Sequence, residues 1–297
     1  MIYLAENIPE NGIEALFCCF HPSLSTVSKM KFHALFLAVA VDPALGKIDK
    51  SSLPTQTLME IFIEGIENKE IICGSTEEPT DVDEWEGFKY SDEHPNEDTE
   101  KPFSINWNEL DLVGSIDLQW LPSTVSSLQA ARNKLGCFLN LTTLPDSIQR
   151  LNLSNNVFSG EIDLCHLLAD LKELNLTRNQ LSGSLHLENL PQSMQSLYVH
   201  VNRFSGTVCL RHLPLNLIEV SLASNNLSGP LDLTRLPINM KFLWLGKNNF
   251  EGETDFSGLP RSLQLLAVSY TNLSGQILAQ NRTTRFYVEH SNVEVIE

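Results

Sequence analysis

Apolar residues recur with a constant spacing of 23 residues along the second half of this chain. Each unit opens with Leu-Pro, or with Leu-Leu in one copy, and the seven starts are Leu121, Leu144, Leu167, Leu190, Leu213, Leu236 and Leu259. Inside each unit an L-x-L core alternates apolar and polar positions, which is the period of a half-buried strand. A fixed period of about 20 to 50 residues predicts a solenoid, in which each unit buries its apolar face against its neighbours. The pattern therefore predicts stacked parallel strands around one continuous core.

An asparagine lies twelve residues after the start of six of these units: Asn133, Asn156, Asn179, Asn202, Asn225 and Asn248. Because a carboxamide both donates and accepts hydrogen bonds, we expect these side chains to form a buried ladder that pairs with main-chain groups. The proline before each strand limits helix growth, and the glycine after the asparagine fits a tight bend. We therefore expect short 3-10 or irregular segments opposite the strands.

The unit reads L-P-x-x-Φ-x-x-L-x-L-x-x-N-x-Φ-S-G-x-Φ-x-L, and it resembles the leucine-rich repeat family. The S-G-x-I/L segment, as in Phe158-Ser-Gly-Glu-Ile162 and Leu181-Ser-Gly-Ser-Leu185, resembles plant-receptor-type repeats, and the leading Leu-Pro also resembles bacterial effector repeats. The resemblance covers about 105–292. It implies an α/β solenoid with a parallel β-sheet on the concave face, a mostly irregular or 3-10 convex side and a small helical N-terminal cap. It also implies that the concave sheet binds partners, without naming one.

The repeat departs from this consensus at several positions. Cys137 stands where the other units have glycine, and Leu110 and Thr271 take the place of the ladder asparagine. The last strand, expected at 286–288, follows its predecessor after 20 residues and lacks Leu-Pro. Terminal units are expected to be atypical because they cap the stack.

Four segments are expected along the chain: an N-terminal extension at 1–29, a secretory signal peptide at 30–40, an N-terminal cap at 41–104 and the solenoid at 105–297. The signal peptide is predicted because Met30 and a lysine precede an apolar run, which ends in an Ala-x-Ala motif at Ala40. The alternative is that this run forms a buried strand or helix of a folded N-terminal piece. No stretch has the roughly 18 apolar residues of a membrane span.

The cap segment contains one predicted helix and one acidic loop. Apolar residues at helical spacing favour a helix over about 55–67. The motif Trp85-Glu-Gly-Phe88 that follows resembles the N-terminal cap of plant-type leucine-rich repeat proteins, which normally contains paired cysteines; here Cys73 is the only cysteine nearby. Residues 77–100 hold eleven acidic residues and one lysine, which indicates a solvated loop or an acidic docking segment.

The net charge of −17 is concentrated before the repeats. Residues 1–104 have seven basic and twenty acidic residues, and 105–297 have thirteen and seventeen. Such an acidic chain is a poor binder of nucleic acid or of anionic membranes. Six asparagines lie in glycosylation sequons, but the repeat itself generates N-L-S, so Asn281, outside the motif, is the predicted glycosylation site.

Motifs of catalysis are missing from the sequence: it has no G-x-S-x-G, phosphate-binding loop, G-x-G-x-x-G, C-x-x-C or H-E-x-x-H. The histidines of the repeats fall at different positions of the unit, so no shared metal face is expected. We therefore predict that the chain is not an enzyme and needs no cofactor or metal.

The outward positions of the strands supply the candidate binding residues. Aromatic and mixed side chains in the later coils are Tyr198, His200, Phe242, Trp244, Lys247, Tyr270 and Tyr287; basic side chains in the earlier coils are Arg132, Arg150 and Arg178. Exposed aromatic and arginine side chains on a rigid sheet are typical interface anchors, although such aromatics can also merely shield the sheet. The sequence thus predicts a secreted or cell-surface module that binds a protein or peptide ligand. An intracellular adaptor or effector, or a structural scaffold, is the alternative.

Overall fold

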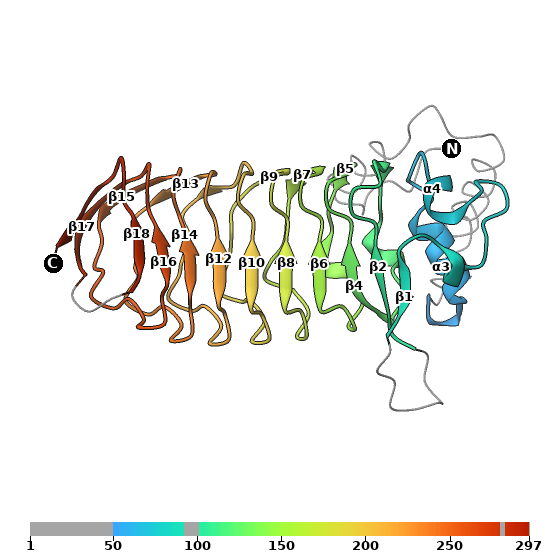
Figure 1. The fold of residues 1–297 in the computed structure, drawn as a ribbon, viewed down its shortest axis with the longest axis horizontal. Helices are drawn as coiled ribbons and strands as arrows, with labels where there is room; N and C mark the ends of the chain where they lie inside the picture. The colour runs from blue at the N-terminus through green and yellow to red at the C-terminus, as the bar shows by residue number, and fades with distance from the viewer. Residues whose placement is uncertain (1–49, 92–100, 280–282, 297) are drawn as a thin grey trace, which may run out of the picture.

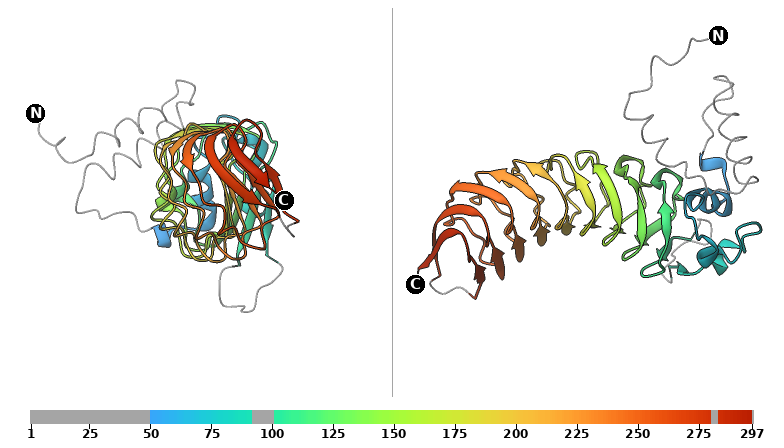
Figure 2. Two further views of the ribbon diagram at one scale, coloured as in Figure 1. Left: turned by 90° about the vertical axis from the view of Figure 1, so that its left-hand side faces the viewer. Right: turned by 90° about the horizontal axis from the view of Figure 1, so that it is seen from above.

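The computed structural model describes residues 50–91, 101–279 and 283–296 as a curved solenoid (Figure 1). The coils follow one another along an arc, which is seen from its edge in the right-hand view of Figure 2. The predicted extension 1–29, the predicted signal peptide 30–40, residues 92–100 of the acidic loop and Asn281 lie outside the described residues. In the described part of the chain, no helix is long and apolar enough to cross a membrane.

One ten-stranded sheet lines the inner side of the arc (Figures 1 and 2). Its strands, in spatial order, are β1 (Phe88–Tyr90), β2 (Phe103–Asn106), β4 (Val125–Gln129), β6 (Arg150–Asn152), β8 (Glu173–Asn175), β10 (Ser196–Tyr198), β12 (Glu219–Ser221), β14 (Phe242–Trp244), β16 (Leu265–Ala267) and β18 (Arg285–Tyr287). Only β1 is antiparallel to its neighbour. Each of the others contributes one coil, so the predicted parallel sheet on the concave face is confirmed.

Two further sheets run along the flank of the solenoid, made by the S-G segments of successive coils. The first contains β3 (Val113–Ser115), β5 (Lys134–Phe138), β7 (Val157–Glu161) and β9 (Gln180–Ser182). The second contains β11 (Ser205–Gly206), β13 (Asn226–Gly229), β15 (Asn249–Glu253), β17 (Asn272–Leu278) and β19 (Asn292–Ile296). The expectation of 3-10 and irregular segments omitted these strands. Two 3-10 turns do follow them in the first coils, η3 (Leu118–Trp120) and η4 (Leu141–Thr143).

The core is a single column of leucine and phenylalanine side chains between the two layers of strands. The strand leucines have essentially no solvent exposure, and the Φ position of the S-G segment places three phenylalanines at the same depth, Phe158, Phe204 and Phe250. Each coil covers the apolar face of the next, which is why no coil would bury its core alone. Rigid stacking of this kind fixes where the outward side chains lie.

The asparagine ladder joins each coil to the preceding one. Asn225 is representative: its Nδ2 donates to the carbonyl of Val199 in the preceding coil at 3.1 Å and to Leu222 in its own coil at 3.0 Å. Its Oδ1 accepts from the backbone N–H of Phe204, again in the preceding coil, at 3.1 Å. The other five ladder asparagines repeat these contacts. The predicted role of the asparagines is therefore confirmed.

A small cap of helices covers the N-terminal end of the core. It consists of α3 (Thr55–Phe62) and α4 (Glu70–Cys73), with the 3-10 turns η1 (Lys50–Ser52) and η2 (Val82–Glu84). The Phe62 ring stacks on buried Trp107 of the first coil, with centroids 5.8 Å apart. Cys73 is a buried free thiol and is the one cysteine among the described residues of this cap.

The cap helix is shorter than the sequence indicates. Apolar spacing predicts a helix to about residue 67, but α3 ends at Phe62. Beyond it, Gly65 accepts a hydrogen bond from Ser115 N–H at 2.8 Å, and Glu67 N–H donates to Val113 at 2.8 Å. The segment after α3 therefore pairs with β3 and is not helical. Ile66 is buried in this paired segment and not on one face of a helix.

Candidate partner-binding face

Strand register aligns one outward position of every coil into a column, which we call the central column. It runs Gln129, Asn152, Asn175, Tyr198, Ser221, Trp244, Ala267 and Tyr287. The alignment is the predicted one, although β18 begins one residue earlier than expected. Because the spacing between strands is about 4.8 Å, side chains of neighbouring coils in this column lie in contact range.

A second column, here called the leading column, lies two residues earlier on each strand. It runs Ser127, Arg150, Glu173, Ser196, Glu219, Phe242, Leu265 and Arg285. Two predicted binding residues, Arg150 and Phe242, belong to it. Its two glutamates and Leu265 were missed by the sequence analysis, yet applying the 23-residue spacing to Arg150 would have found them.

Four predicted residues occupy the turn directly after the strand instead of the strand itself. Arg132, Arg178, Lys247 and Tyr270 all have a positive φ, between 55° and 57°. Their backbone N–H groups donate to the next coil, as Lys247 does to Ser269 at 2.8 Å. Asn155 and Ser224 share this conformation at the same position of their own coils. The strained backbone is thus a property of the repeat and does not single out a functional site.

The three arginines of the early coils do not form one basic patch. Arg132 and Arg178 lie at the turn position two coils apart, whereas Arg150 lies in the leading column. Arg132 pairs with Glu109 at 2.5 Å, both side chains being exposed. Glu173 stands next to Arg150 in register. One of the three arginines is therefore paired with a carboxylate, and a second has a glutamate beside it on the next strand.

The aromatic part of the face is a contiguous cluster. Phe242 and Trp244 stack on one strand, with ring centroids 5.4 Å apart and planes 11° apart. Glu219 neighbours Phe242 in the leading column and accepts a hydrogen bond from the hydroxyl of Tyr198. Burial, followed by this contact with Glu219, raises the pKa of Tyr198 to about 12. Tyr198 therefore stays a neutral hydroxyl, held in place against the sheet.

His200 lies beside this cluster, two residues after Tyr198. The ring is half-buried, and its Nδ1 lies 3.1 Å from Thr177 Oγ1 in the preceding coil. Burial lowers the pKa of His200, and the positive charge of Arg178 lowers it further. The imidazole is accordingly neutral at physiological pH and offers a polar contact without charge.

The C-terminal end of the face presents exposed rings. Tyr270 is 52% exposed, stacks on His290 with centroids 4.5 Å apart, and lies 5.8 Å from Lys247 Nζ. Tyr287 closes the central column and is 42% exposed. These two side chains are the most accessible of the predicted aromatic residues, while Tyr198, Phe242 and Trp244 are half-buried.

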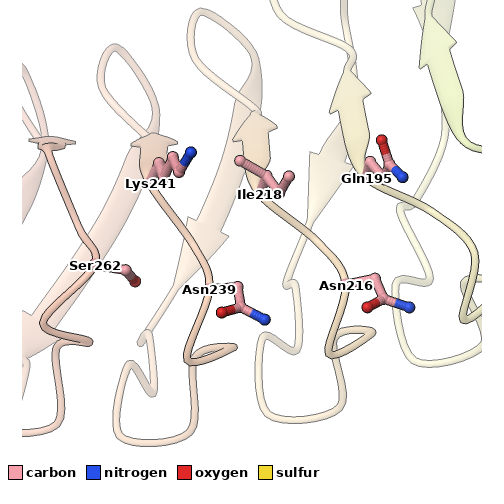
Figure 3. Close-up of a pocket in the computed structure, with 6 residues that line it drawn as sticks. All are labelled: Gln195, Asn216, Ile218, Asn239, Lys241 and Ser262. Carbon is pink, nitrogen blue, oxygen red and sulfur yellow. The ribbon is translucent and has the colours of Figure 1, made fainter.

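A groove lies along the edge of the sheet, just before the strands begin (Figure 3). It has a volume of about 340 Å³ and is lined by Gln195, Asn216, Ile218, Asn239, Lys241 and Ser262. Figure 3 shows two rows of these side chains across successive coils. Within residues 50–91, 101–279 and 283–296, no group of three or more His, Cys, Asp or Glu side chains could hold a metal ion.

Comparison with known proteins gives alignments to solved structures of other repeat proteins. A leucine-rich effector protein, YopM from Yersinia pestis, has 22% identity and a TM-score of 0.49, and the alignment covers 64% of this chain and 50% of that one. The ectodomain of GASSHO1/SCHENGEN3 from Arabidopsis thaliana, solved with CASPARIAN STRIP INTEGRITY FACTOR 2, has 17% identity, a TM-score of 0.46, and 81% and 36% coverage. A plant ice-binding protein has 16% identity, a TM-score of 0.44, and 81% and 94% coverage.

No protein-family model matches the chain, and no curated protein sequence matches it. The chain spans half or less of the length of the receptor and effector structures with which it aligns. Because these TM-scores lie below 0.5, the assignment of the fold rests on the chain itself. Its 23-residue unit, its parallel inner sheet and its asparagine ladder are those of a leucine-rich repeat solenoid.

Proposed function

We propose that the chain is a recognition module that binds a protein or peptide partner on the concave sheet. The stacked Phe242–Trp244 pair carries the proposal, because it places two large rings side by side on the outward face of a rigid strand. Aromatic side chains of this kind supply much of the energy of protein interfaces and lose little conformational entropy on binding. Tyr198 and His200 extend the surface with polar groups, and Tyr270 and Tyr287 extend it with exposed rings.

The partner contacts proposed in the early coils are polar. Arg150 in the leading column and Arg178 at the turn have exposed side chains, while Arg132 shares its charge with Glu109. These residues orient a partner but add little binding free energy, because exposed ion pairs contribute only about 0–1 kcal/mol each.

The test compares one double variant of the concave face with one control double variant of the flank sheet. Peptides that bind the full chain would be selected from a random display library, and their affinity measured by calorimetry. Replacing Tyr198 and Trp244 together with alanine should weaken binding by at least about 30-fold, since truncating a central aromatic residue typically costs about 2 kcal/mol or more. Replacing Phe138 and Val157, exposed apolar residues of the flank sheet, should change the affinity little. Equal affinity of both double variants would refute the proposal.

We further propose that the protein is secreted or displayed on the cell surface, on the basis of the Met30–Ala40 segment. Peptide mass spectrometry of the protein from its native cells tests this. A mature N-terminus near residue 41, with a glycan on Asn281, supports an extracellular module. An intact residue 1 with unmodified asparagines would contradict it, and would favour an intracellular adaptor or effector, or a structural scaffold, instead.

A further inference from the structure

Two aliphatic side chains project into solvent from adjacent turns before the strands. Leu215 and Ile238 are 68% and 74% exposed. They lie 23 residues apart, at the position directly after the Leu-Pro pair, where the other repeats have Ser123, Asp146, Ala169, Gln192 and Arg261, all of them exposed. The position is therefore a surface position in each of these seven repeats, and two neighbouring repeats place a large aliphatic residue there.

The residues that directly follow these two line the groove that runs along the sheet edge (Figure 3). Each directly precedes a groove-lining amide, Asn216 or Asn239, and half-buried Ile218 lies on the strand side. The turns are fixed to one another by side-chain hydrogen bonds: Asn216 Nδ2 donates to the carbonyl of Gln192 at 2.8 Å, and Ser262 Oγ donates to that of Ile238 at 2.6 Å. The groove is therefore a formed surface, with apolar, amide and hydroxyl groups repeated at the spacing of the coils.

Two exposed basic side chains, Lys241 and Arg261, lie at this groove, although the chain as a whole is acidic. Lys241 lines the groove and is exposed. Arg261 continues the Leu215–Ile238 row in the next coil and is exposed. Arg235, three residues before Ile238, is exposed too, but its charge is opposed by the nearby carboxylate of Asp232. The acidic side chain of the leading column next to the groove is Glu219, which keeps its negative charge while it accepts a hydrogen bond from the hydroxyl of Tyr198. The net charge of the whole chain is −17, so this edge is locally suited to an acidic partner.

The groove also continues the proposed binding face. Lys241 directly precedes Phe242, and Ile218 directly precedes Glu219, so the leading column begins where the groove ends. A partner that crosses the sheet at Trp244 and Phe242 reaches the groove within one or two residues, because an extended segment advances about 3.3 Å per residue.

We propose that this edge groove binds an extended peptide segment that presents an aliphatic side chain next to a carboxylate. The aliphatic side chain packs on Leu215 and Ile238, the carboxylate pairs with Lys241 or Arg261, and the amides of Asn216 and Asn239 hydrogen-bond the peptide backbone. The proposal rests on the recognition function above and specifies the chemistry of the partner at one end of the face.

The experiment uses the full chain and peptides selected on it from a random display library. Selected peptides should be enriched in sequences that place leucine, isoleucine or valine beside aspartate or glutamate. Leu215→Gln with Ile238→Gln should weaken their binding by at least about tenfold, and Lys241→Glu should weaken binding of the acidic peptides further. The control Leu278→Gln changes a leucine that is 60% exposed at the end of β17, and it should leave the affinity unchanged.

The outcomes separate this proposal from the function on which it rests. If the peptides lose affinity for the Tyr198/Trp244 double variant but bind the Leu215/Ile238 double variant normally, the groove proposal is wrong and the recognition function stands. If the peptides lose affinity only for the Leu215/Ile238 double variant, the proposal that the aromatic cluster of the concave face binds the partner is wrong instead. Enrichment of basic peptides contradicts the charge assignment. Binding to phosphatidylserine vesicles that is lost in the double variant would assign the two side chains to a membrane and overturn the peptide proposal.

Discussion

Each ladder asparagine satisfies main-chain groups of two coils at once. In Asn225 one amide nitrogen serves carbonyls in both coils, and the amide oxygen takes the N–H of Phe204. The side chain is buried, so water cannot replace these contacts when it is removed. Thr271, at the equivalent position of a later coil, donates to Val268 in its own coil at 2.7 Å. A carboxamide is therefore needed for the hydrogen bonds between coils, because the threonine hydroxyl makes only the hydrogen bond within its own coil.

Asn225→Ala is expected to lower the free energy of unfolding by about 3 kcal/mol, because it leaves buried donors and acceptors unpaired. The adjacent Asn226 is exposed and provides the control, so Asn226→Ala should change stability by less than about 0.5 kcal/mol. Urea unfolding followed by circular dichroism measures both values. Similar midpoints for the two variants would contradict the ladder as a stabilising element.

His200 makes stability depend on pH, because its pKa is lowered in the folded protein by burial and by Arg178. The unfolded chain therefore binds more protons than the folded one near and below pH 6.5, and stability falls as the pH falls through that range. His200→Gln should reduce the loss of stability between pH 7.5 and pH 5. His186→Gln changes an exposed histidine of the preceding coil and should not. Identical losses in the two variants would rule out this contribution.

At the scale of elements, the cap depends on the glycine of its Trp-x-Gly-Phe motif. Gly87 has a φ of +69°, and a Cβ at this position would lie 2.0 Å from the carbonyl oxygen of Asn106. The antiparallel pairing of β1 with β2 would have to shift to admit it. Gly74 in the same cap has a similar φ of +77°, but the nearest atom to its Cβ would be 3.4 Å away. Both glycines thus have a positive φ, but only Gly87 lacks room for a Cβ atom.

Gly74→Ala is expected to cost about 1–3 kcal/mol of stability, because Gly74 combines a φ of +77° with a ψ of −39°, a conformation that alanine rarely adopts. Gly87→Ala should cost at least about 2 kcal/mol more, because backbone atoms must move to relieve the overlap. Thermal unfolding by calorimetry measures the difference. A smaller effect at Gly87 than at Gly74 would show that the cap adapts freely and that β1 does not depend on this close approach.

The sequence predicted the inner strands and the ladder because their residue types recur in every unit. The flank strands were missed because their S-G segments have serine and glycine where a strand pattern needs β-branched or aromatic residues. Those strands form through backbone pairing between coils, as between Ser228 and Asn249, which depends on stacking and not on local preference. The end of α3 was also missed, since the pairing of Ile66 with Gly114 is a contact between distant residues.

At the scale of the whole molecule, the arc turns isolated surface residues into continuous columns. Trp244 and Tyr198 lie 46 positions apart in the sequence but only two coils apart in the central column. The column membership was predictable from the period. The separation of the three arginines also follows from the period, because Arg150 occupies another position of the unit than Arg132 and Arg178. The pairing of Tyr198 with Glu219 and the edge groove were not predictable, because each depends on side-chain directions across neighbouring coils.

The most direct test of the recognition function is hydroxyl-radical footprinting of the full chain with and without a selected peptide. Oxidation of exposed side chains reports which surface the partner covers. The concave account predicts that Phe242, Trp244 and Tyr270 become protected, while Phe138 on the flank sheet is oxidised equally in both states. Protection of Phe138 and Val157, with Trp244 and Tyr270 unchanged, would place the partner on the flank and contradict the account.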